Sequence, residues 1–492
     1  MCYYSPNGSH QSYHCKRPSV DLLADHSRFD RFILVNDQPP QSAEALRYQE
    51  QRGLDNVPGY SVGLQFQLND GPRAYIALSR TELVLYLGSN LAIHFDLKGR
   101  LVKVSDQSQF WRRSLSGRVL HSRKLTAEEG GGLERIVLSD GDARIVVQQI
   151  QPLTGAVLAA FEDAATPIEV ARPSIEEARL RIAPVLRLAA EFDEPAAARD
   201  AQQCQSIYGR VAVLPPDQYN ALVFQATEGC AYDGCTFCGL YRDVKHRKKS
   251  VDEFRQHIHD AVRYHGEGLR ARRSIFLGEA NALTQPTSIL KDFFHVIREN
   301  IELPPSEQPS AGISADWWLG DERRFDGISS FLDAFTNTNR TITDYRDLRA
   351  AGLRRVYIGL ESGDASLLAW LRKPATPEAA LKCVRLMKEC DIIVGVIVLI
   401  GAGGHEKAAG HVRETIRVLN EMPLGRNDYI YFSPLVMYPG SQYDTQAMSD
   451  AVTPLSEEEM RQQEQELRLG LRFDQRRGKP YLARYELETF VY

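Results

Sequence analysis

The chain has 492 residues, of which 43% are hydrophobic and 25% are charged, and its formal net charge is −5 at pH 7. This length and composition predict a soluble globular protein of two or three domains. The slight negative charge excludes a general electrostatic attraction to nucleic acid or to an anionic membrane. The most apolar stretch, residues 392–400, is too short to span a bilayer. No basic region followed by an apolar one opens the chain, so we expect no signal peptide and a cytoplasmic location.

The first part of the chain predicts a mainly-β domain. We assign no structure to residues 1–55, a mainly-β domain to 56–170, and a helical connector to 171–217, where 174–192 and 194–204 have helical spacing. Turn residues such as Asn69, Asp70, Gly71 and Pro72 separate short apolar runs. The expected strands are 62–68, 74–78, 83–87, 91–96, 101–104, 135–138 and 143–150, the last two as a hairpin.

A basic stretch with one aromatic residue lies within this domain. It runs from Trp111 to Arg118 and continues with Arg123 and Lys124. Such a stretch can contact phosphate or RNA. Because the whole chain is acidic, we favour a solvated loop.

From residue 218 to 445 the pattern alternates between strands and helices. The expected strands are 221–226, 274–277, 311–315, 355–360, 392–400 and 428–433, and the expected helices are 251–264, 287–299, 345–351, 377–389 and 407–421. Short apolar strands joined by helices predict an α/β fold with a parallel sheet buried on both faces. Residues 316–339 predict a packed insertion. Residues 446–492 predict a C-terminal helix at 456–472 and a tail with a candidate strand at 480–487.

Three of the eight cysteines form one cluster in the sequence. Cys230, Cys235 and Cys238 have Cys-x4-Cys-x2-Cys spacing, directly after the first strand of the α/β region. Cys2, Cys15 and Cys204 lack paired spacing, and Cys383 and Cys390 lie seven residues apart in an apolar helical pattern that predicts core residues. With only three of eight cysteines clustered, the sequence indicates a reducing compartment. Gly229 and Gly234 allow tight turns beside the three thiols.

Clustered thiolates bind zinc or an iron–sulfur cluster. Three local thiolates would leave one iron of a [4Fe–4S] cluster without a protein ligand, and an open metal position is typical of a reactive site. The alternative is a structural zinc site with His246 as the fourth ligand.

The cysteine loop, with Phe237 before its third cysteine, resembles the cluster loop of the radical SAM superfamily, although the first gap here is one residue longer than usual. The resemblance implies a partial six-stranded (β/α)6 barrel, a [4Fe–4S] cluster held by the three cysteines, and S-adenosylmethionine on the open iron. It also implies reductive cleavage of S-adenosylmethionine, a 5′-deoxyadenosyl radical that attacks an unidentified substrate, and an electron donor such as flavodoxin or ferredoxin.

Gly278 and Glu279 end the second strand and resemble the Gly-Gly-Glu motif that meets the amino group of S-adenosylmethionine. A carboxylate suits that role because an ammonium donates charge-assisted hydrogen bonds to it. Asn281 is the alternative for the same role. The resemblance also makes Phe237 a candidate cofactor contact.

The sequence Ile-Gly-Leu-Glu-Ser-Gly closes the fourth strand and resembles the branch that includes oxygen-independent coproporphyrinogen oxidases and methylthiotransferases. By that resemblance, Glu361 or Ser362 contacts the ribose or the amino-acid end of the cofactor. Lys373 either meets a carboxylate or is a surface lysine. Gly401 opens a glycine turn that resembles the adenine-side turn of the family.

The function predicted from these residues is a radical S-adenosylmethionine enzyme that acts on an unidentified substrate. One alternative is an RNA-modifying radical enzyme that uses the β domain as a platform. A second is a non-catalytic, zinc-stabilised binding protein. Iron and sulfide in the purified protein would exclude zinc, and co-purified RNA with a steep salt dependence would favour the first alternative.

Overall fold

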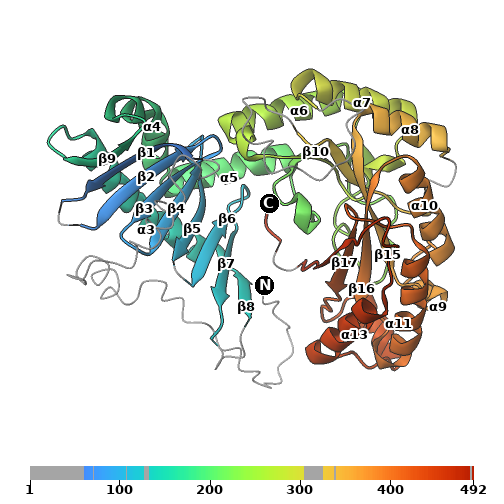
Figure 1. Ribbon diagram of the computed structural model, residues 1–492. Coiled ribbons are helices and arrows are strands. Elements are labelled where there is room, and N and C mark those ends of the chain that lie inside the picture. Colours follow the sequence, from blue (N-terminus) through green and yellow to red (C-terminus); the bar gives the residue numbers. More distant parts are fainter. Residues whose placement is uncertain are drawn as a thin grey trace.

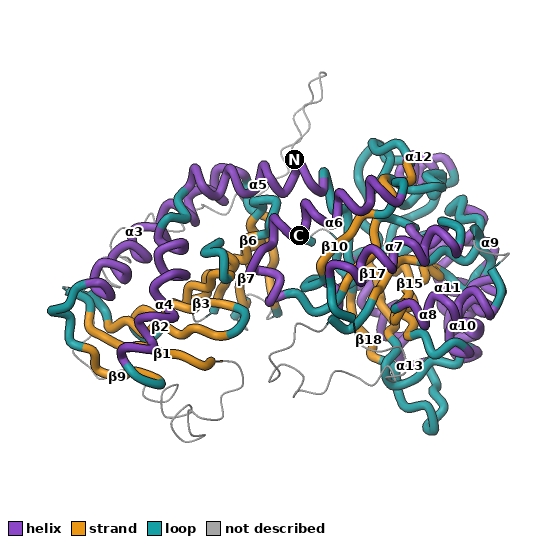
Figure 2. Tube along the Cα trace, turned by 90° about the horizontal axis from the view of Figure 1, so that it is seen from above, coloured by secondary structure: helices purple, strands orange, loops and turns teal. Residues whose placement is uncertain are grey.

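The described chain forms two sheets that lie side by side, joined by helix α5 (Glu194–Tyr208), with the C-terminus between them (Figure 1; Figure 2). The computed structural model describes residues 60–69, 71–106, 108–126, 132–303, 325–336, 340–487 and 490–492. Sequence predictions for residues 1–55 therefore lie outside the described residues. No helix of the described chain has the length and apolarity needed to cross a bilayer.

The antiparallel sheet has nine strands, and their spatial order is β8-β7-β6-β5-β4-β3-β2-β1-β9. These strands are β1 (Tyr60–Gln67), β2 (Arg73–Ser79), β3 (Glu82–Leu87), β4 (Leu91–Asp96), β5 (Leu101–Asp106), β6 (Gln109–Arg113), β7 (Val119–Lys124), β8 (Leu133–Val137) and β9 (Ile168–Arg172). Because consecutive short strands joined by turns pair locally, most of this meander was predictable from the apolar runs.

The sequence prediction of a strand at 143–150 is wrong, because these residues belong to helix α3 (Asp140–Glu162). The helix begins at Ser139, whose side chain accepts a hydrogen bond from the backbone of Asp142. The buried residues of this segment are Ala143, Val146, Val147 and Ile150, which is helical spacing. Together with α4 (Ile175–Ala190), the helix packs with the antiparallel sheet in one hydrophobic core.

The basic stretch is a solvated loop only in part. Residues 114–118 form the turn between β6 and β7, where Ser116 and Arg118 are exposed, but the residues on either side belong to these strands, and Arg113 is buried. Arg113 forms an ion pair with Asp200 of α5 at 3.2 Å, and Arg123 forms one with Glu134 of β8 at 3.1 Å. The guanidinium groups of these two arginines are therefore engaged in ion pairs within the chain.

The second sheet is parallel and has seven strands that follow one another in chain order. They are β10 (Leu222–Gln225), β13 (Ile275–Gly278), β14 (Ile328–Phe331), β15 (Leu353–Glu361), β16 (Ile393–Ile400), β17 (Tyr429–Pro434) and β18 (Tyr481–Arg484). The predicted strand at 311–315 lies outside the described residues. The third strand, β14, lies inside the segment 316–339 that the sequence assigned to an insertion, so that assignment is wrong for β14. The C-terminal candidate strand is β18, which extends the sheet beyond six strands.

Helices follow the parallel strands and cover the sheet (Figure 1). They are α6 (Val251–His265), α7 (Thr287–Asn300), α8 (Ile342–Ala351), α9 (Ala365–Trp370), α10 (Pro377–Glu389), α11 (Gly404–Glu421), α12 (Gln442–Ser449) and α13 (Glu457–Gly470). A capping box of Ser250 and Glu253 begins α6, at the start of the helix expected at 251–264. The loops that enter these helices lie at the carboxyl edge of the strands, which is where α/β proteins bind ligands.

A buried polar network connects the segment before β10 to the parallel sheet. Asp217, in the short helix η2 (Pro216–Gln218), accepts hydrogen bonds from the hydroxyls of Tyr357 and Tyr431, each at 2.6 Å. It also forms an ion pair with Arg355. The end of the predicted connector is therefore part of the parallel-sheet core.

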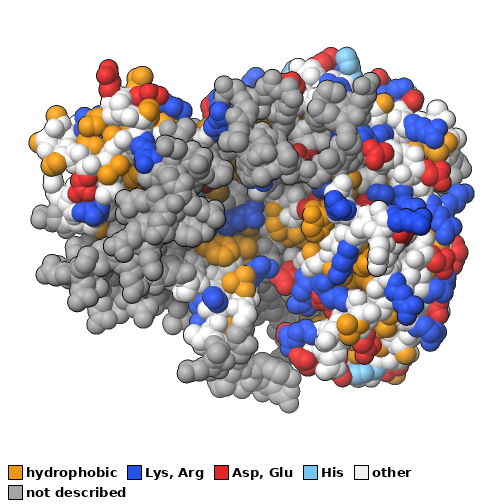
Figure 3. Space-filling view, in the orientation of Figure 1, with side chains coloured by type: hydrophobic (Ala, Val, Ile, Leu, Met, Phe, Trp, Pro, Cys, Tyr) orange, Lys and Arg blue, Asp and Glu red, His pale blue; other side chains and the backbone are white. Residues whose placement is uncertain are grey.

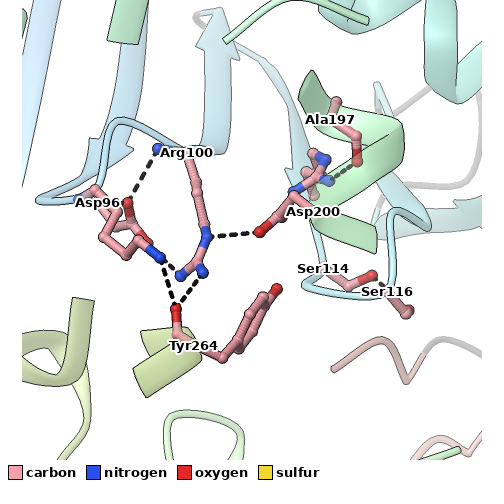
Figure 4. Close-up of polar contacts among 9 residues, drawn as sticks. Asp96, Arg100, Ser114, Ser116, Ala197, Asp200 and Tyr264 are labelled. Atoms are coloured by element: carbon pink, nitrogen blue, oxygen red, sulfur yellow. Dashed lines mark hydrogen bonds and ion pairs between the residues drawn. The ribbon is translucent and has the colours of Figure 1, made fainter. Parts of the chain in front are cut away.

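The two sheets are joined by a second network, centred on Arg100 (Figure 4). The guanidinium of Arg100 contacts Asp96 at 3.3 Å and Asp200 at 2.7 Å. It also donates to the backbone carbonyl of Tyr264, near the end of α6, and lies over the ring of Tyr264. A cation at the carboxyl end of a helix is favourable, so this junction is held by charge as well as by packing.

The surface of the parallel-sheet part carries both signs of charge. In Figure 3, basic and acidic side chains are interspersed over its visible face. The chain as a whole has 59 basic and 64 acidic residues, which agrees with this mixture.

Candidate active site

The cysteine loop lies at the carboxyl end of β10, as the sequence predicts. A two-stranded ladder of β11 (Thr227–Glu228) and β12 (Arg247–Lys248) closes the loop at its base. The guanidinium of Arg247 reinforces this base with a 2.6 Å contact to the carboxylate of Glu228. The loop is therefore a closed unit between the first parallel strand and α6.

Inside the loop, the side chain of Arg242 holds two backbone carbonyl groups in place. The guanidinium of Arg242 donates to the carbonyl oxygens of Cys238 at 2.9 Å and Cys235 at 2.8 Å. Gly229 has φ +67°, and a Cβ there would lie 2.6 Å from the carbonyl oxygen of Val244. Only glycine fits that position without displacing the backbone.

The three cysteines differ in their exposure to water. Cys235 is buried, and Cys230 and Cys238 are half-buried. Burial raises the pKa of Cys235 to about 12 and raises the pKa values of Cys230 and Cys238. The neighbouring thiols Cys238 and Cys230 raise the pKa of Cys235 further, and Cys238 raises the pKa of Cys230. Since metals bind the thiolate form, metal uptake by these thiols must release protons.

Within the described residues, no three side chains of His, Cys, Asp or Glu are arranged to hold a single metal ion. His246, the fourth ligand of the zinc alternative, is half-buried, and its two ring nitrogens have no hydrogen-bond partner.

A segment that follows α9 is bonded directly to the cysteine loop. The backbone N–H of Thr236 donates to the carbonyl of Leu371 at 3.0 Å. The hydroxyl of Tyr232 donates to the carbonyl of Arg372 at 2.7 Å. These bonds place the next residue, Lys373, beside the thiols.

Lys373 is a buried lysine, so the surface alternative is wrong. Its ammonium lies 3.0 Å from the carboxylate of Glu361, and the two side chains are 10% and 11% exposed. Burial lowers the pKa of Lys373, but Glu361 and Cys235 raise it, and the net pKa lies above its ordinary value. The ammonium is therefore charged at neutral pH.

Glu361 has φ 58° at the end of β15, and its carboxylate folds back over Gly359. A Cβ at Gly359 would lie 2.2 Å from the Glu361 Oε1 atom and 3.1 Å from the Lys373 Nζ atom. The glycine of the Gly-Leu-Glu-Ser-Gly motif thus makes room for the ion pair.

Glu279 follows β13 and is 8% exposed. Its carboxylate accepts a hydrogen bond from the side-chain amide of Gln225, and its backbone N–H donates to the hydroxyl of Thr227 at 3.3 Å. Burial raises the pKa of Glu279 to about 7, against the lowering effects of Gln225 and Lys249. This carboxyl group therefore changes charge near neutral pH.

Tyr241 connects Glu279 to the cysteine loop. The ring is buried, and burial raises the pKa of its hydroxyl, with further raising by Glu279, Cys238 and Cys230. Glu279 and Tyr241 also line a small cavity next to β10 and β13, together with Val211, Val213, Leu214, Val223, Phe276, Gly278 and Phe331. Gly278 is buried at the end of β13.

Asn281, the alternative to Glu279, is 6% exposed and its amide nitrogen donates to Asp333 and to the hydroxyl of Thr336. Because a carboxylate only accepts hydrogen bonds, Asp333 determines which way the amide of Asn281 faces. The Asn281 Oδ1 atom is buried and has no partner.

Ser362 is fully buried, and its hydroxyl is bonded to His411 of α11 at 2.8 Å and to the backbone N–H of Asp364 at 3.0 Å. These bonds hold the loop after β15 against α11. A direct contact of Ser362 with a cofactor stays a prediction.

Gly401 follows β16 with φ +85°, and its backbone N–H donates to the side chain of Gln463 in α13 at 2.8 Å. Phe237 of the cysteine loop packs in a cluster that contains Leu399 and Ala402, the neighbours of the glycine turn. The structure thus brings the turn and the cysteine loop together.

Several residues of this site were missed in the sequence. Gln225, Tyr241 and Lys249 surround Glu279, but each is a common residue type with no motif of its own. Asp333 was hidden because β14 was assigned to an insertion. Asp333 follows the end of β14 by two residues, and a carboxylate at the carboxyl end of a parallel strand is a candidate site residue. A correct assignment of β14 would therefore have indicated Asp333.

Residues 224–419 match the family model described as the Radical SAM superfamily. The match covers less than half of the 492 residues. A search of the curated proteins found no match.

Three solved structures illustrate the structural similarity. The coproporphyrinogen III oxidase HemN from Escherichia coli, described as a radical SAM enzyme, is 14% identical over 55% of this chain and 54% of its own, with a TM-score of 0.35. The radical S-adenosylmethionine methyltransferase TsrM from Kitasatospora setae, with cobalamin and a [4Fe–4S] cluster bound, is 15% identical over 47% and 39%, with a TM-score of 0.33. The cobalamin-dependent S-adenosylmethionine radical enzyme OxsB is 15% identical over 51% and 32%, with a TM-score of 0.32. The chain thus spans about a third of the length of OxsB.

Proposed function

We propose that this chain is a radical SAM enzyme, because residues 224–419 match that family model. In this proposal Cys230, Cys235 and Cys238 hold a [4Fe–4S] cluster, and the carboxyl edge of the parallel sheet binds S-adenosylmethionine. The observation that carries the proposal is the closed loop that holds three cysteines at that edge, one of them buried and two half-buried. The substrate is unidentified.

The residues present fit an iron–sulfur cluster by their donor chemistry. Thiolates are the usual ligands of such clusters, and three of them leave one iron for a cofactor. Gly229 brings the backbone close beside the thiols where a side chain would collide with Val244. The cluster and S-adenosylmethionine, when bound, supply one-electron cleavage of the cofactor and a carbon-centred radical that removes hydrogen from the substrate.

The chain's own residues then bind, orient and exclude water. The carboxylate of Glu279 would accept hydrogen bonds from the amino group of S-adenosylmethionine, with Gln225 holding that carboxylate in place. Glu361, Ser362, Phe237 and Gly401 would form the remaining cofactor contacts, as the family resemblance implies. The burial of the thiols and of Glu279 keeps water from the reactive position.

Two finer features belong to the same proposal. The parallel sheet would be a partial barrel whose open side is next to β10 and β18, the first and last strands of the sheet. Flavodoxin or ferredoxin would supply the electron. Both features follow from the family resemblance.

Anaerobic reconstitution of the full chain with iron and sulfide tests the function. With dithionite and S-adenosylmethionine, we expect a brown protein that forms methionine and 5′-deoxyadenosine. A colourless protein that holds zinc and leaves S-adenosylmethionine intact would contradict the proposal. Metabolite, peptide and RNA fractions should then be added, because a substrate increases 5′-deoxyadenosine formation.

The raised pKa of Glu279 predicts a pH-dependent affinity for S-adenosylmethionine. With a pKa of about 7, the group is mostly carboxylate above neutrality and mostly neutral acid below it. Between about pH 8 and about pH 6 the ionised fraction falls roughly tenfold, and affinity should fall with it. Glu279→Gln should lose roughly tenfold in affinity at the higher pH and lose the pH dependence.

Calorimetric titration of the reconstituted protein at the two pH values measures this effect. Glu378→Gln, on the exposed start of α10, is the matched control and should behave as the unsubstituted protein. Unchanged affinity in Glu279→Gln would transfer the amino-group role to Asn281.

A further inference from the structure

The buried ion pair of Glu361 and Lys373 lies at the carboxyl end of β15, next to the cysteine loop. The ammonium and carboxylate are 3.0 Å apart and nearly inaccessible to solvent. The backbone N–H of Lys373 bonds to the carbonyl of Leu368 at 2.9 Å, which fixes the turn after α9. A buried ion pair often adds little stability, since desolvation offsets its attraction. Its position therefore calls for another explanation.

The pair is attached to the cysteine loop on both sides of Cys235. Thr236 bonds to Leu371, and Tyr232 bonds to Arg372, the two residues before Lys373. The ammonium is 6.0 Å from the centre of the Phe237 ring, within the loop. The distance between the charges and the thiols is thus set by the backbone.

Both charges lie where water has little access. The side chains of Lys373 and Glu361 are 10% and 11% exposed, so their charges act on the neighbouring cysteine loop with little screening by solvent.

We propose that Glu361 and Lys373 set the reduction potential of the cluster held by the three cysteines, with the ammonium raising it and the carboxylate lowering it. This inference rests on the proposed function. Reduction adds one electron to the cluster, so the reduced form is the more negative. A nearby cation stabilises that form and a nearby anion destabilises it, and both effects are strong where water is excluded. In this role Glu361 and Lys373 act through the cluster and do not touch the reacting atoms of the substrate.

The two single substitutions should shift the potential in opposite directions. Lys373→Met leaves the carboxylate alone and should make the potential more negative. Glu361→Gln leaves the ammonium alone and should make it more positive. We expect each change to alter the equilibrium constant for reduction about tenfold, which is ~59 mV for a one-electron couple. The double variant should return close to the unsubstituted protein, and Lys373→Arg, which keeps the charge, should remain near it.

The measurement is a dithionite titration of the reconstituted full chain without S-adenosylmethionine, followed by electron paramagnetic resonance. Lys382→Met, which removes an exposed lysine from α10, is the control and should not shift the potential. Opposite shifts that cancel in the double variant support the proposal, because a purely structural role would not give opposite signs.

Single substitutions that leave the potential unchanged, or shift it in the same direction, would overturn the proposal. If the Lys373→Met protein takes up no cluster, the Glu361→Gln protein and the double variant test the proposal. An unchanged reduction potential in Glu361→Gln would also contradict it. Failure of the unsubstituted chain to assemble any cluster would instead contradict the proposed function.

Discussion

Cys235→Ala is expected to lose most of its iron and all measurable cleavage of S-adenosylmethionine. Each thiolate of the loop would hold a different iron, so two remaining thiols leave the cluster labile. Cys235 is the most buried of the three and interacts with the other two thiols. The other cysteines of the described chain, Cys204, Cys383 and Cys390, lie outside the loop, so none of their thiols could replace the thiol of Cys235. Iron and sulfide analysis after reconstitution gives the result.

Cys383→Ala is the matched control for this experiment. Cys383 lies in α10, where burial raises its pKa to about 12, and it lies outside the cysteine loop. The iron content of the Cys383→Ala protein should equal that of the unsubstituted protein. Full iron in Cys235→Ala, or lost iron in a folded Cys383→Ala protein, would refute the three-cysteine assignment.

Asp217→Ala is expected to destabilise the parallel-sheet core by about 3–5 kcal/mol. The carboxylate pairs with Arg355 and accepts bonds from the hydroxyls of Tyr357 and Tyr431. The side chains of Asp217 and Arg355 are 12% and 19% exposed, so solvent would replace little of the lost interaction. Removing the carboxylate leaves a cation and two hydroxyls of the core without their acceptor.

Urea unfolding followed by circular dichroism measures this loss as a lower midpoint. Asp347→Ala breaks an ion pair with Lys291 in which both side chains are about half exposed, and it should cost at most about 1 kcal/mol. Equal midpoints for the two variants would show that the Asp217 network does not hold the end of the predicted connector to the sheet.

The local signals in the sequence were sufficient for the cysteine loop and for most strands. Cys230, Cys235 and Cys238 could be predicted as ligands because ligand chemistry depends on residue type and spacing. The capping box of Ser250 and Glu253 predicted where α6 begins, since a helix start is decided by a few neighbouring residues. The strands around the motifs were correct because buried parallel strands are short apolar runs.

The wrong secondary-structure predictions concern segments whose local sequence is compatible with two different structures. Residues 143–150 suit a strand or a helix, and packing of α3 and α4 with the antiparallel sheet decides for a helix. The strand β14 is four residues long and includes Ser329 and Ser330, so its apolar signal is weak. Its place is decided by backbone pairing with β13 and β15, which are distant in sequence.

By itself the sequence determined that three cysteines follow the first parallel strand and precede α6, because this depends on residue types at short spacing. The binding of iron by their thiols stays a prediction. Only the tertiary structure decided that Lys373 is buried against Glu361, that Asp217 serves Arg355, and that burial raises the pKa of Glu279. Charge pairing and desolvation depend on residues brought together from distant parts of the chain, and no local pattern records which ones will meet.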